Sequence, residues 1–222
     1  MNYLEKYKEH PLTYTLMFIS LVVFLLGSLS TSLDQYFYTN GVLHGYSVIM
    51  KGEFLRLVNS TFLHSDMIHL LMNMLSLLIV GRVVEGLFTK AAYLSIYFLA
   101  AFFGSFTAIY MDLGVHAVGA SGAIFGLFGA LAGFAFVHRN TMRSQFIAFM
   151  KNFGLILVLN LVIGFAFPSI SISAHVGGLI AGMVGGFIIA KNPKYIVIYI
   201  VFSLILLIAS EKYLTMLYYA TI

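Results

Sequence analysis

Seven long apolar segments restrict what this chain can fold into more than any other feature of its sequence. They cover about residues 12–29, 66–82, 91–111, 119–137, 152–168, 173–190 and 195–215. A helix of about 20 largely apolar residues is long enough to cross a bilayer. The 222 residues are 61% hydrophobic and 9% charged, whereas soluble domains carry roughly 25% charged residues. The sequence therefore predicts an all-α membrane protein, a bundle of seven transmembrane helices in a single domain covering residues 1–222.

The first apolar segment also has an alternative interpretation as a signal peptide, because Lys6 and Lys8 precede it. The segment is long for such a peptide, and the sequence SLS at 28–30 is a poor cleavage signal, which favours a membrane helix. The absence of cysteine excludes disulfides and thiol catalysis. The net charge of +4 is too small to indicate a nucleic-acid partner.

The basic residues are distributed unevenly over the segments that connect the predicted spans. If the N-terminus is cytoplasmic, nine of the twelve lie on the cytoplasmic side, namely Lys6, Lys8, Arg82, Lys90, Arg139, Arg143, Lys151, Lys191 and Lys194. The remaining three lie outside, namely Lys51, Arg56 and Lys212. Short cytoplasmic loops carry an excess of Lys and Arg. The distribution therefore predicts a cytoplasmic N-terminus and an external C-terminus.

The longest segment outside the predicted spans covers about residues 30–65. It combines several aromatic residues with few charges. Two interpretations remain open, an amphiphilic segment that lies at the membrane interface and an ordinary extracytoplasmic loop.

Histidine, asparagine and serine residues occur inside three of the predicted spans. His69 and Asn73 lie in the second span, Ser121 in the fourth and His175 in the sixth. Such residues are costly in a membrane, so each ionisable one is a functional hypothesis. Because spans two, four and six run from outside to inside, His69, Ser121 and His175 start their helices at similar depth. Asn73 is one turn deeper and shares a helix face with His69. The spacing predicts a shared site in the outer part of the bilayer.

Each of these residues also has a simpler interpretation. Asn73 can form a hydrogen bond between helices, each histidine can be a satisfied polar contact, and Ser121 can be a packing residue between glycines. The functional hypothesis depends on the whole set and on no single member.

Small residues recur at every fourth position in the two helices that carry Ser121 and His175. One helix has Gly122, Gly126 and Ala130, and the other has Ala174, Gly178, Gly182 and Gly186. Small residues at this spacing allow helix backbones to approach closely. Packing alone explains the pattern, but the same contact would also bring Ser121 and His175 together.

This set of residues contains the components of an acyl-transfer site. A serine hydroxyl is a weak nucleophile until a base takes its proton, and His175 could be that base and later the acid. No carboxylate lies at matching depth in a span, so the pair would be a dyad. His69, Asn73 and the backbone N–H of Ser121 could donate to the developing oxyanion.

Three motifs at these positions resemble the rhomboid family of intramembrane serine proteases. They are "GASG" at 119–122, "HSDMIHLLMNM" at 64–74 and "AHVGGLIAG" at 174–182. The order and placement of the motifs agree with the family over about residues 50–190. The G-R-x-x-E pattern of Gly81, Arg82 and Glu85 is also similar to the family, and looks structural.

The resemblance implies a six-helix core over about residues 12–190 and an additional C-terminal helix over about 195–215. It implies Ser121 as the nucleophile, His175 as the base, and His69 and Asn73 as oxyanion donors. Supporting roles fall to His64, near the opening of the site, and to Gly119, two positions before the serine. No cofactor and no metal are implied. The implied partners are the lipid bilayer and transmembrane substrates, in a bacterial plasma membrane, with cleavage near the outer face.

Two positions depart from the family pattern. The external loop has Leu55 before Arg56, where the family often has tryptophan. Phe125 replaces a tyrosine that stacks on the base histidine in many members. Because a phenyl ring can also stack, we expect His175 to remain positioned.

Two other functions compete with proteolysis. A non-proteolytic family member that binds transmembrane clients would normally lack the nucleophile or the base, and this chain has both. A transporter would need polar residues that continue to the cytoplasmic side. The three helices are almost wholly apolar below the proposed site, with Ser76 a minor exception.

Overall fold

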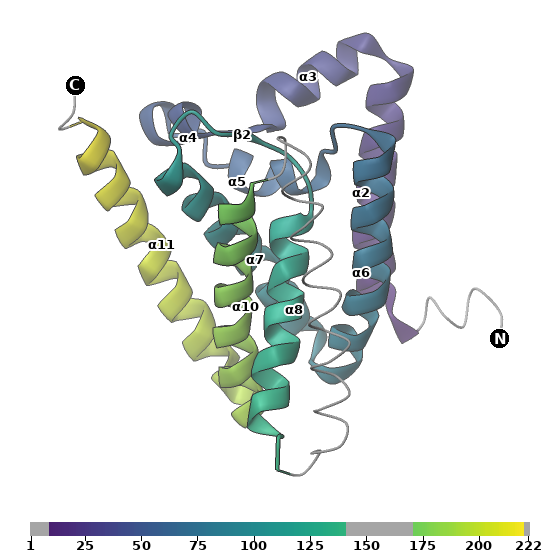
Figure 1. The fold of residues 1–222 in the computed structure, drawn as a ribbon, viewed down its shortest axis with the longest axis vertical. Helices are drawn as coiled ribbons and strands as arrows, with labels where there is room; N and C mark the ends of the chain where they lie inside the picture. Colours follow the sequence, from purple (N-terminus) through teal and green to yellow (C-terminus); the bar gives the residue numbers. More distant parts are fainter. Residues whose placement is uncertain (1–8, 141–170, 220–222) are drawn as a thin grey trace.

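The computed structural model describes residues 9–140 and 171–219 as a bundle of long helices with a short-helix segment at one end (Figure 1). The long helices of this part are α2 (Pro11–Leu29), α6 (Met67–Leu87), α7 (Lys90–Met111), α8 (Ser121–Val137), α10 (Ile172–Lys191) and α11 (Ile196–Tyr219). Five of the described helices are long and apolar enough to cross a membrane, and α8 is a shorter apolar helix. Helices thus occupy six of the seven predicted segments. The segment at 152–168 lies outside the described residues.

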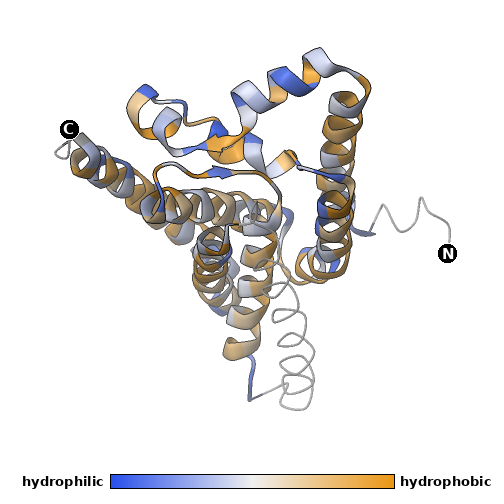
Figure 2. Cartoon of the chain, turned by 45° about the horizontal axis from the view of Figure 1, so that its top comes forward, coloured by the Kyte–Doolittle hydropathy of each residue, from blue (hydrophilic) through white to orange (hydrophobic). Residues whose placement is uncertain are grey.

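Of the five described helices long enough to cross a membrane, α7 is the most enclosed. Of its most apolar window 56% is buried, against 17% for α2 and for the helical stretch that includes α11. Hydrophobic residues cover the long helices, and hydrophilic ones gather on α3 (Thr31–Gly41) and the connecting segments (Figure 2). Exposed apolar side chains along α2 and α11 fit a surrounding of lipid tails, because such surfaces do not persist in water.

Helix α6 continues five residues beyond the predicted end at 82, where the charges of Arg82 and Glu85 interrupt the apolar run. Glu85 is buried and accepts hydrogen bonds from the backbone N–H groups of Leu12 (2.9 Å) and Thr13 (2.8 Å) and from the Thr13 hydroxyl (2.7 Å). The first N–H groups of a helix have no partner within the helix. The carboxylate of Glu85 therefore caps α2 and fixes it against α6.

Helices α8 and α10 pack with their backbones in contact along the predicted small residues. A Cβ atom on Gly178 would overlap the carbonyl oxygen of Gly122, and one on Gly182 would overlap that of Gly126. One turn further, Gly186 meets Ala130 in the same way. The carbonyl groups involved belong to the helix backbone and cannot rotate away. Glycine is therefore required at these positions for α10 to lie at its observed distance from α8.

The segment at 30–65, expected as a loop, is mostly helical. Besides α3 it contains α4 (Gly45–Lys51), α5 (Arg56–Asn59) and the 3-10 helix η1 (Ser60–Phe62). Strand β1 (Leu43–His44) pairs antiparallel with β2 (His116–Ala117), which lies in the loop before α8. Strands of two residues are too short to show an alternating pattern of apolar and polar residues, so the sequence does not predict this pairing.

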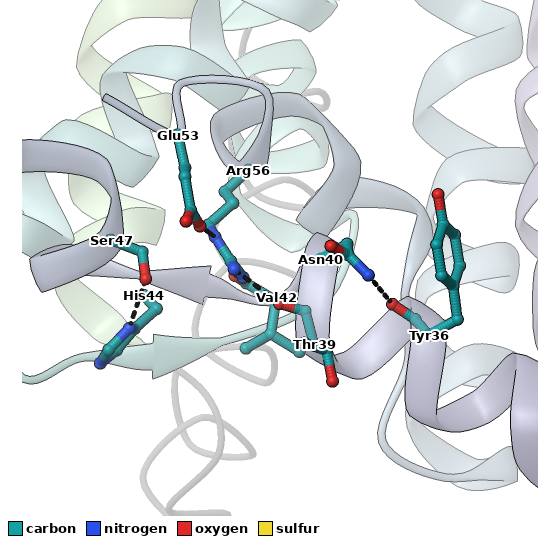
Figure 3. Close-up of polar contacts among 8 residues, drawn as sticks. All are labelled: Tyr36, Thr39, Asn40, Val42, His44, Ser47, Glu53 and Arg56. Atoms are coloured by element: carbon teal, nitrogen blue, oxygen red, sulfur yellow. Dashed lines mark hydrogen bonds and ion pairs between the residues drawn. The ribbon is translucent and has the colours of Figure 1, made fainter. Parts of the chain in front are cut away.

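Arg56 holds this segment of short helices together (Figure 3). Its guanidinium donates to the backbone carbonyls of Val42 (2.9 Å) and Thr39 (2.6 Å) and pairs with the carboxylate of Glu53. The side chain is almost fully buried, so unpaired carbonyls or an unpaired charge would be costly here. Leu55, which precedes Arg56, is exposed, so the contacts of Arg56 do not depend on a buried side chain at position 55.

Candidate active site

Ser121 is the first residue of α8, and the bend that precedes it depends on Gly119. Gly119 has a φ of +118°, a region that L side chains rarely adopt. Its N–H donates to the carbonyl oxygen of Ser60 at 2.9 Å, which ties the bend to η1. The N-cap residue, Ala120, has no side chain that can accept from the first turn. The N–H groups at the start of α8 thus remain available to a ligand.

His69 and Asn73 lie directly beside this bend. A Cβ atom on Gly119 would come within 2.7 Å of His69 Nε2 and 3.8 Å of Asn73 Nδ2. Both side chains are buried on α6. Asn73 Nδ2 donates one hydrogen to the His69 carbonyl at 2.9 Å, so its second N–H is free to serve the site. Within the described residues, His69 Nε2 has no hydrogen-bond partner.

His175 lies in the first turn of α10 and is 3% exposed. Its ring stacks on that of Phe125, with centroids 4.2 Å apart and planes inclined by 7°. This is the stacking expected from a phenyl ring at that position. The stack fixes the plane of the imidazole while leaving its nitrogens unblocked, and neither nitrogen has a hydrogen-bond partner in the part of the chain that the structure describes.

No hydrogen bond joins Ser121 to His175 among the described residues. Their helices are nevertheless in backbone contact, because a Cβ atom on Gly122 would lie 3.6 Å from the carbonyl oxygen of Ala174. Hydrogen bonds between catalytic groups are often long without substrate and tighten when it binds. The Ser121 hydroxyl and the His175 imidazole therefore lie in the first turns of two adjoining helices, without a hydrogen bond between them.

A small cavity opens at this point. It has a volume of about 30 Å³ and is lined by Ser121, Gly119, Thr61, Ser105, Ser171 and Ala174, among others. A cavity of roughly 10–15 Å³ on this measure can hold one water molecule. The hydroxyl of Ser121 thus has polar surroundings with room for water.

His64 does not line this cavity and packs against the ring of His69. The two rings are 5.2 Å apart at 72°, edge to face. Burial lowers the pKa of His64 to about 3, so this ring is neutral at physiological pH. Its position is compatible with a supporting role, since it packs on an oxyanion-donor candidate without touching Ser121.

Two residues of the site were missed from the sequence. Asp66 caps α6 by accepting from the N–H of His69 at 2.8 Å, and Ser65 contacts His69 Nδ1 at 3.1 Å. The signal that could have found them is an aspartate three positions before a helical histidine, which is typical of an N-cap.

Comparison with known proteins gives a family for this arrangement. A sequence model of the Rhomboid domain matches residues 51–192. RHOMBOID-like protein 5 of Arabidopsis thaliana is 35% identical over 150 residues, which cover 67% of this chain and 48% of that protein. RHOMBOID-like protein 6, mitochondrial, of the same plant is 34% identical over 170 residues, which cover 76% and 53%.

A bacterial relative is also similar. Rhomboid protease GluP of Bacillus subtilis (strain 168) is 38% identical over 140 residues, which cover 61% of this chain and 26% of that protein. The chain spans about half the length of the plant relatives it matches. Every motif described above lies within the matched region, with Leu55 and Arg56 near its start.

Proposed function

The chain belongs to the rhomboid family and is a multi-pass integral membrane protein, and from this premise we propose that it is an intramembrane serine endopeptidase. Its substrates would be transmembrane or membrane-anchored proteins, cleaved near the outer face of the membrane. Ser121 would be the nucleophile and His175 the general base and acid. No cofactor or metal enters the proposed reaction.

In the first half of the reaction, Ser121 Oγ forms a bond to the scissile carbonyl carbon. The hydroxyl proton moves to a ring nitrogen of His175, and the carbonyl π electrons move to the oxygen, which becomes an oxyanion. When the carbon–nitrogen bond breaks, His175 gives the proton to the leaving amine. The product is an acyl-enzyme on Ser121.

In the second half, a water molecule attacks the acyl carbon and gives a proton to His175. Collapse of the second tetrahedral intermediate returns that proton to Ser121 Oγ and releases the carboxyl product. The cavity of about 30 Å³ beside Ser121 supports this step, because it offers polar space for water next to the ester bond.

The oxyanion would be bound by the second N–H of Asn73, by His69 and by the N–H of Ser121. The uncapped start of α8 supports the last donor, because the positive end of a helix dipole favours an anion. Removing one such donor in serine proteases costs about 10²–10³ in kcat.

One observation carries this proposal. The Gly119 bend lies, with the start of α8 and Ser121, against His69 and Asn73, while the His175 ring of α10 stacks on Phe125 of the same α8. Helix packing explains the glycines, but it does not explain the two buried histidines. Among the described residues, His69 Nε2 and both ring nitrogens of His175 have no hydrogen-bond partner. Buried polar atoms of that kind call for a functional explanation.

We also keep the predicted topology as part of the proposal. In Figure 1 the first residues of α6, α8 and α10 lie at the end of the bundle that carries α3. With the N-terminus in the cytoplasm, this end faces outward, as in a bacterial plasma membrane protein. We also propose that the chain forms a single domain with seven transmembrane helices, of which α11 is the seventh.

The test is cleavage of a fluorogenic transmembrane substrate by the purified full chain in proteoliposomes. Ser121→Ala and His175→Ala should each abolish cleavage, while Ser76→Ala, a buried serine deeper in α6, should retain it. A fluorophosphonate probe should label the wild type and not Ser121→Ala. Undiminished cleavage by Ser121→Ala would refute the nucleophile assignment. A folded wild type that neither cleaves nor takes the probe would instead favour a client-binding protein.

A further inference from the structure

A hydrogen-bonded chain of three side chains leads from solvent to one proposed oxyanion donor. The hydroxyl of Ser65 donates to Asp66 Oδ2 at 2.9 Å and lies 3.1 Å from His69 Nδ1. The other oxygen of Asp66, Oδ1, accepts from the backbone N–H of His69 at 2.8 Å. Ser65 is therefore the only side chain among the described residues that bonds to the ring of His69.

The hydroxyl of Ser65 has one hydrogen and two possible acceptors. The hydrogen bond from the His69 backbone, aided by Ser65, lowers the pKa of Asp66, so this carboxylate is ionised and can only accept. If Ser65 donates to Asp66, its oxygen must accept a hydrogen from His69 Nδ1. If it turns to His69 instead, Nδ1 must be the acceptor.

The consequence appears at the opposite nitrogen of the same ring. A neutral imidazole carries one hydrogen, on either Nδ1 or Nε2. Nε2 faces the Gly119 bend, where the oxyanion would form, and has no partner among the described residues. The ring can donate to an oxyanion from Nε2 only when Nδ1 has given up its hydrogen. Asn73 has no such condition, because its amide always carries two hydrogens.

We propose that Ser65 is a positioning residue that selects the tautomer of His69, by donating its single hydrogen to Nδ1 when the oxyanion forms. This inference deepens the proposed function and rests on it. In the switch, Ser65 rotates its hydroxyl from Asp66 to Nδ1. The ring releases its Nδ1 proton to water and takes one from water at Nε2, so the charge of the ring is unchanged. Asp66 is the competing acceptor that holds the other state.

The exposure of Ser65 makes this proposal testable without damage to the core. Ser65 borders a larger cavity of about 610 Å³ between α2, α3 and the start of α6, so loss of its hydroxyl leaves the packing intact. Ser65→Ala removes the switch, and Ser65→Thr keeps a hydroxyl. A matched control is Ser47→Ala, since Ser47 Oγ contacts the Nδ1 of another histidine, His44, at 3.0 Å.

The experiment combines kinetics with ¹⁵N NMR of histidine-labelled full-length protein in detergent. We expect Ser65→Ala to lower kcat about tenfold or more, up to the 10²–10³ of losing the donor, with little change in KM. An interaction made only in the transition state has this signature. Ser65→Thr should restore most of the rate, and Ser47→Ala should leave it unchanged.

The spectra read the tautomer directly. In wild type modified by a fluorophosphonate, His69 should carry its hydrogen on Nε2, and in modified Ser65→Ala on Nδ1. In unmodified protein, Ser65→Ala should shift the His69 Nδ1 resonance, which tests the contact even if the chain is no protease. Equal kcat and equal His69 spectra in wild type and Ser65→Ala would overturn the inference. A wild type without cleavage or labelling, but with the shifted resonance, would count against the proposed function alone.

Discussion

Replacement of Gly119 by alanine tests whether the bend before Ser121 positions the oxyanion donors. The new Cβ atom would lie 2.7 Å from His69 Nε2 and 2.9 Å from His69 Cε1. Ordinary van der Waals contact begins at 3.4 Å, so the ring must withdraw by about 0.7 Å. The φ of +118° lies beyond the left-handed helical region and adds a backbone strain of roughly 1–3 kcal/mol for a residue with a Cβ atom.

These two effects predict different losses in different assays. A donor displaced by this distance loses most of its stabilising effect, so kcat/KM should fall about 10²-fold. That fall corresponds to about 2.7 kcal/mol of transition-state stabilisation. The free energy of unfolding should fall mainly by the strain, about 1–3 kcal/mol, because the surrounding helices need not separate.

Gly52→Ala is the matched control for the strain. Gly52 also has a positive φ, of +70°, but its Cβ atom would meet only Phe54 Cε2, at 3.7 Å. Because Gly52 lies in the ordinary left-handed region, this variant should lose roughly 1–2 kcal/mol of stability and keep its kcat/KM. The assays are cleavage of a fluorogenic transmembrane substrate and thermal unfolding in detergent. If Gly119→Ala cleaves at the rate of Gly52→Ala, the His69 ring does not bind the oxyanion from its observed position.

Three further perturbations have expected outcomes. Gly182→Val should destabilise the fold by about 1–3 kcal/mol or more, because its side chain would meet the backbone of α8. Gly86→Val should cost less in the same thermal unfolding assay, because a Cβ atom there would make an ordinary contact of 3.8 Å with the His10 side chain. Glu85→Gln should lower the free energy of unfolding by about 1–3 kcal/mol, since it weakens the cap of α2; an unchanged midpoint would contradict that role. Burial, and then the nearby His116, lower the pKa of His44 below its ordinary 6.5. As the pH falls, His44 in the unfolded segment therefore takes up a proton at a higher pH than His44 in the folded protein. The β1–β2 pair should lose stability as the pH falls below about 6.5. Hydrogen exchange of its amides, corrected for intrinsic rates, measures this weakening.

The sequence predicted those features that arise from local patterns. Apolar runs indicated the helices to within a few residues, because a helix in lipid must satisfy its backbone internally. The recurrence of small residues indicated the contact between α8 and α10, which the glycines at 178 and 182 confirm. The stacking of Phe125 on His175 followed from the resemblance to the rhomboid family, together with the ability of a phenyl ring to stack as a tyrosine does.

The features that escaped prediction depend on residues far apart in the chain. The pairing of β1 with β2 joins positions 43–44 to 116–117, and no local period announces it. The extension of α6 to Leu87 depends on the start of α2, which provides donors for Glu85. The catalytic roles of Ser121, His175, His69 and Asn73 stay predictions until cleavage is measured.

The glycines of α10 have a consequence for the site that goes beyond close packing. Gly178, Gly182 and Gly186 each meet the residue at the same offset along α8, so the two helices have a single register. A slip by one helical turn would move His175 by about 5.4 Å relative to Ser121. A proton transfer between them tolerates only a few tenths of an ångström around roughly 2.6–3.2 Å. The repeated backbone contact therefore fixes the position of His175, the proposed base, relative to Ser121, the proposed nucleophile. One register thus serves both the packing of the two helices and the proposed reaction.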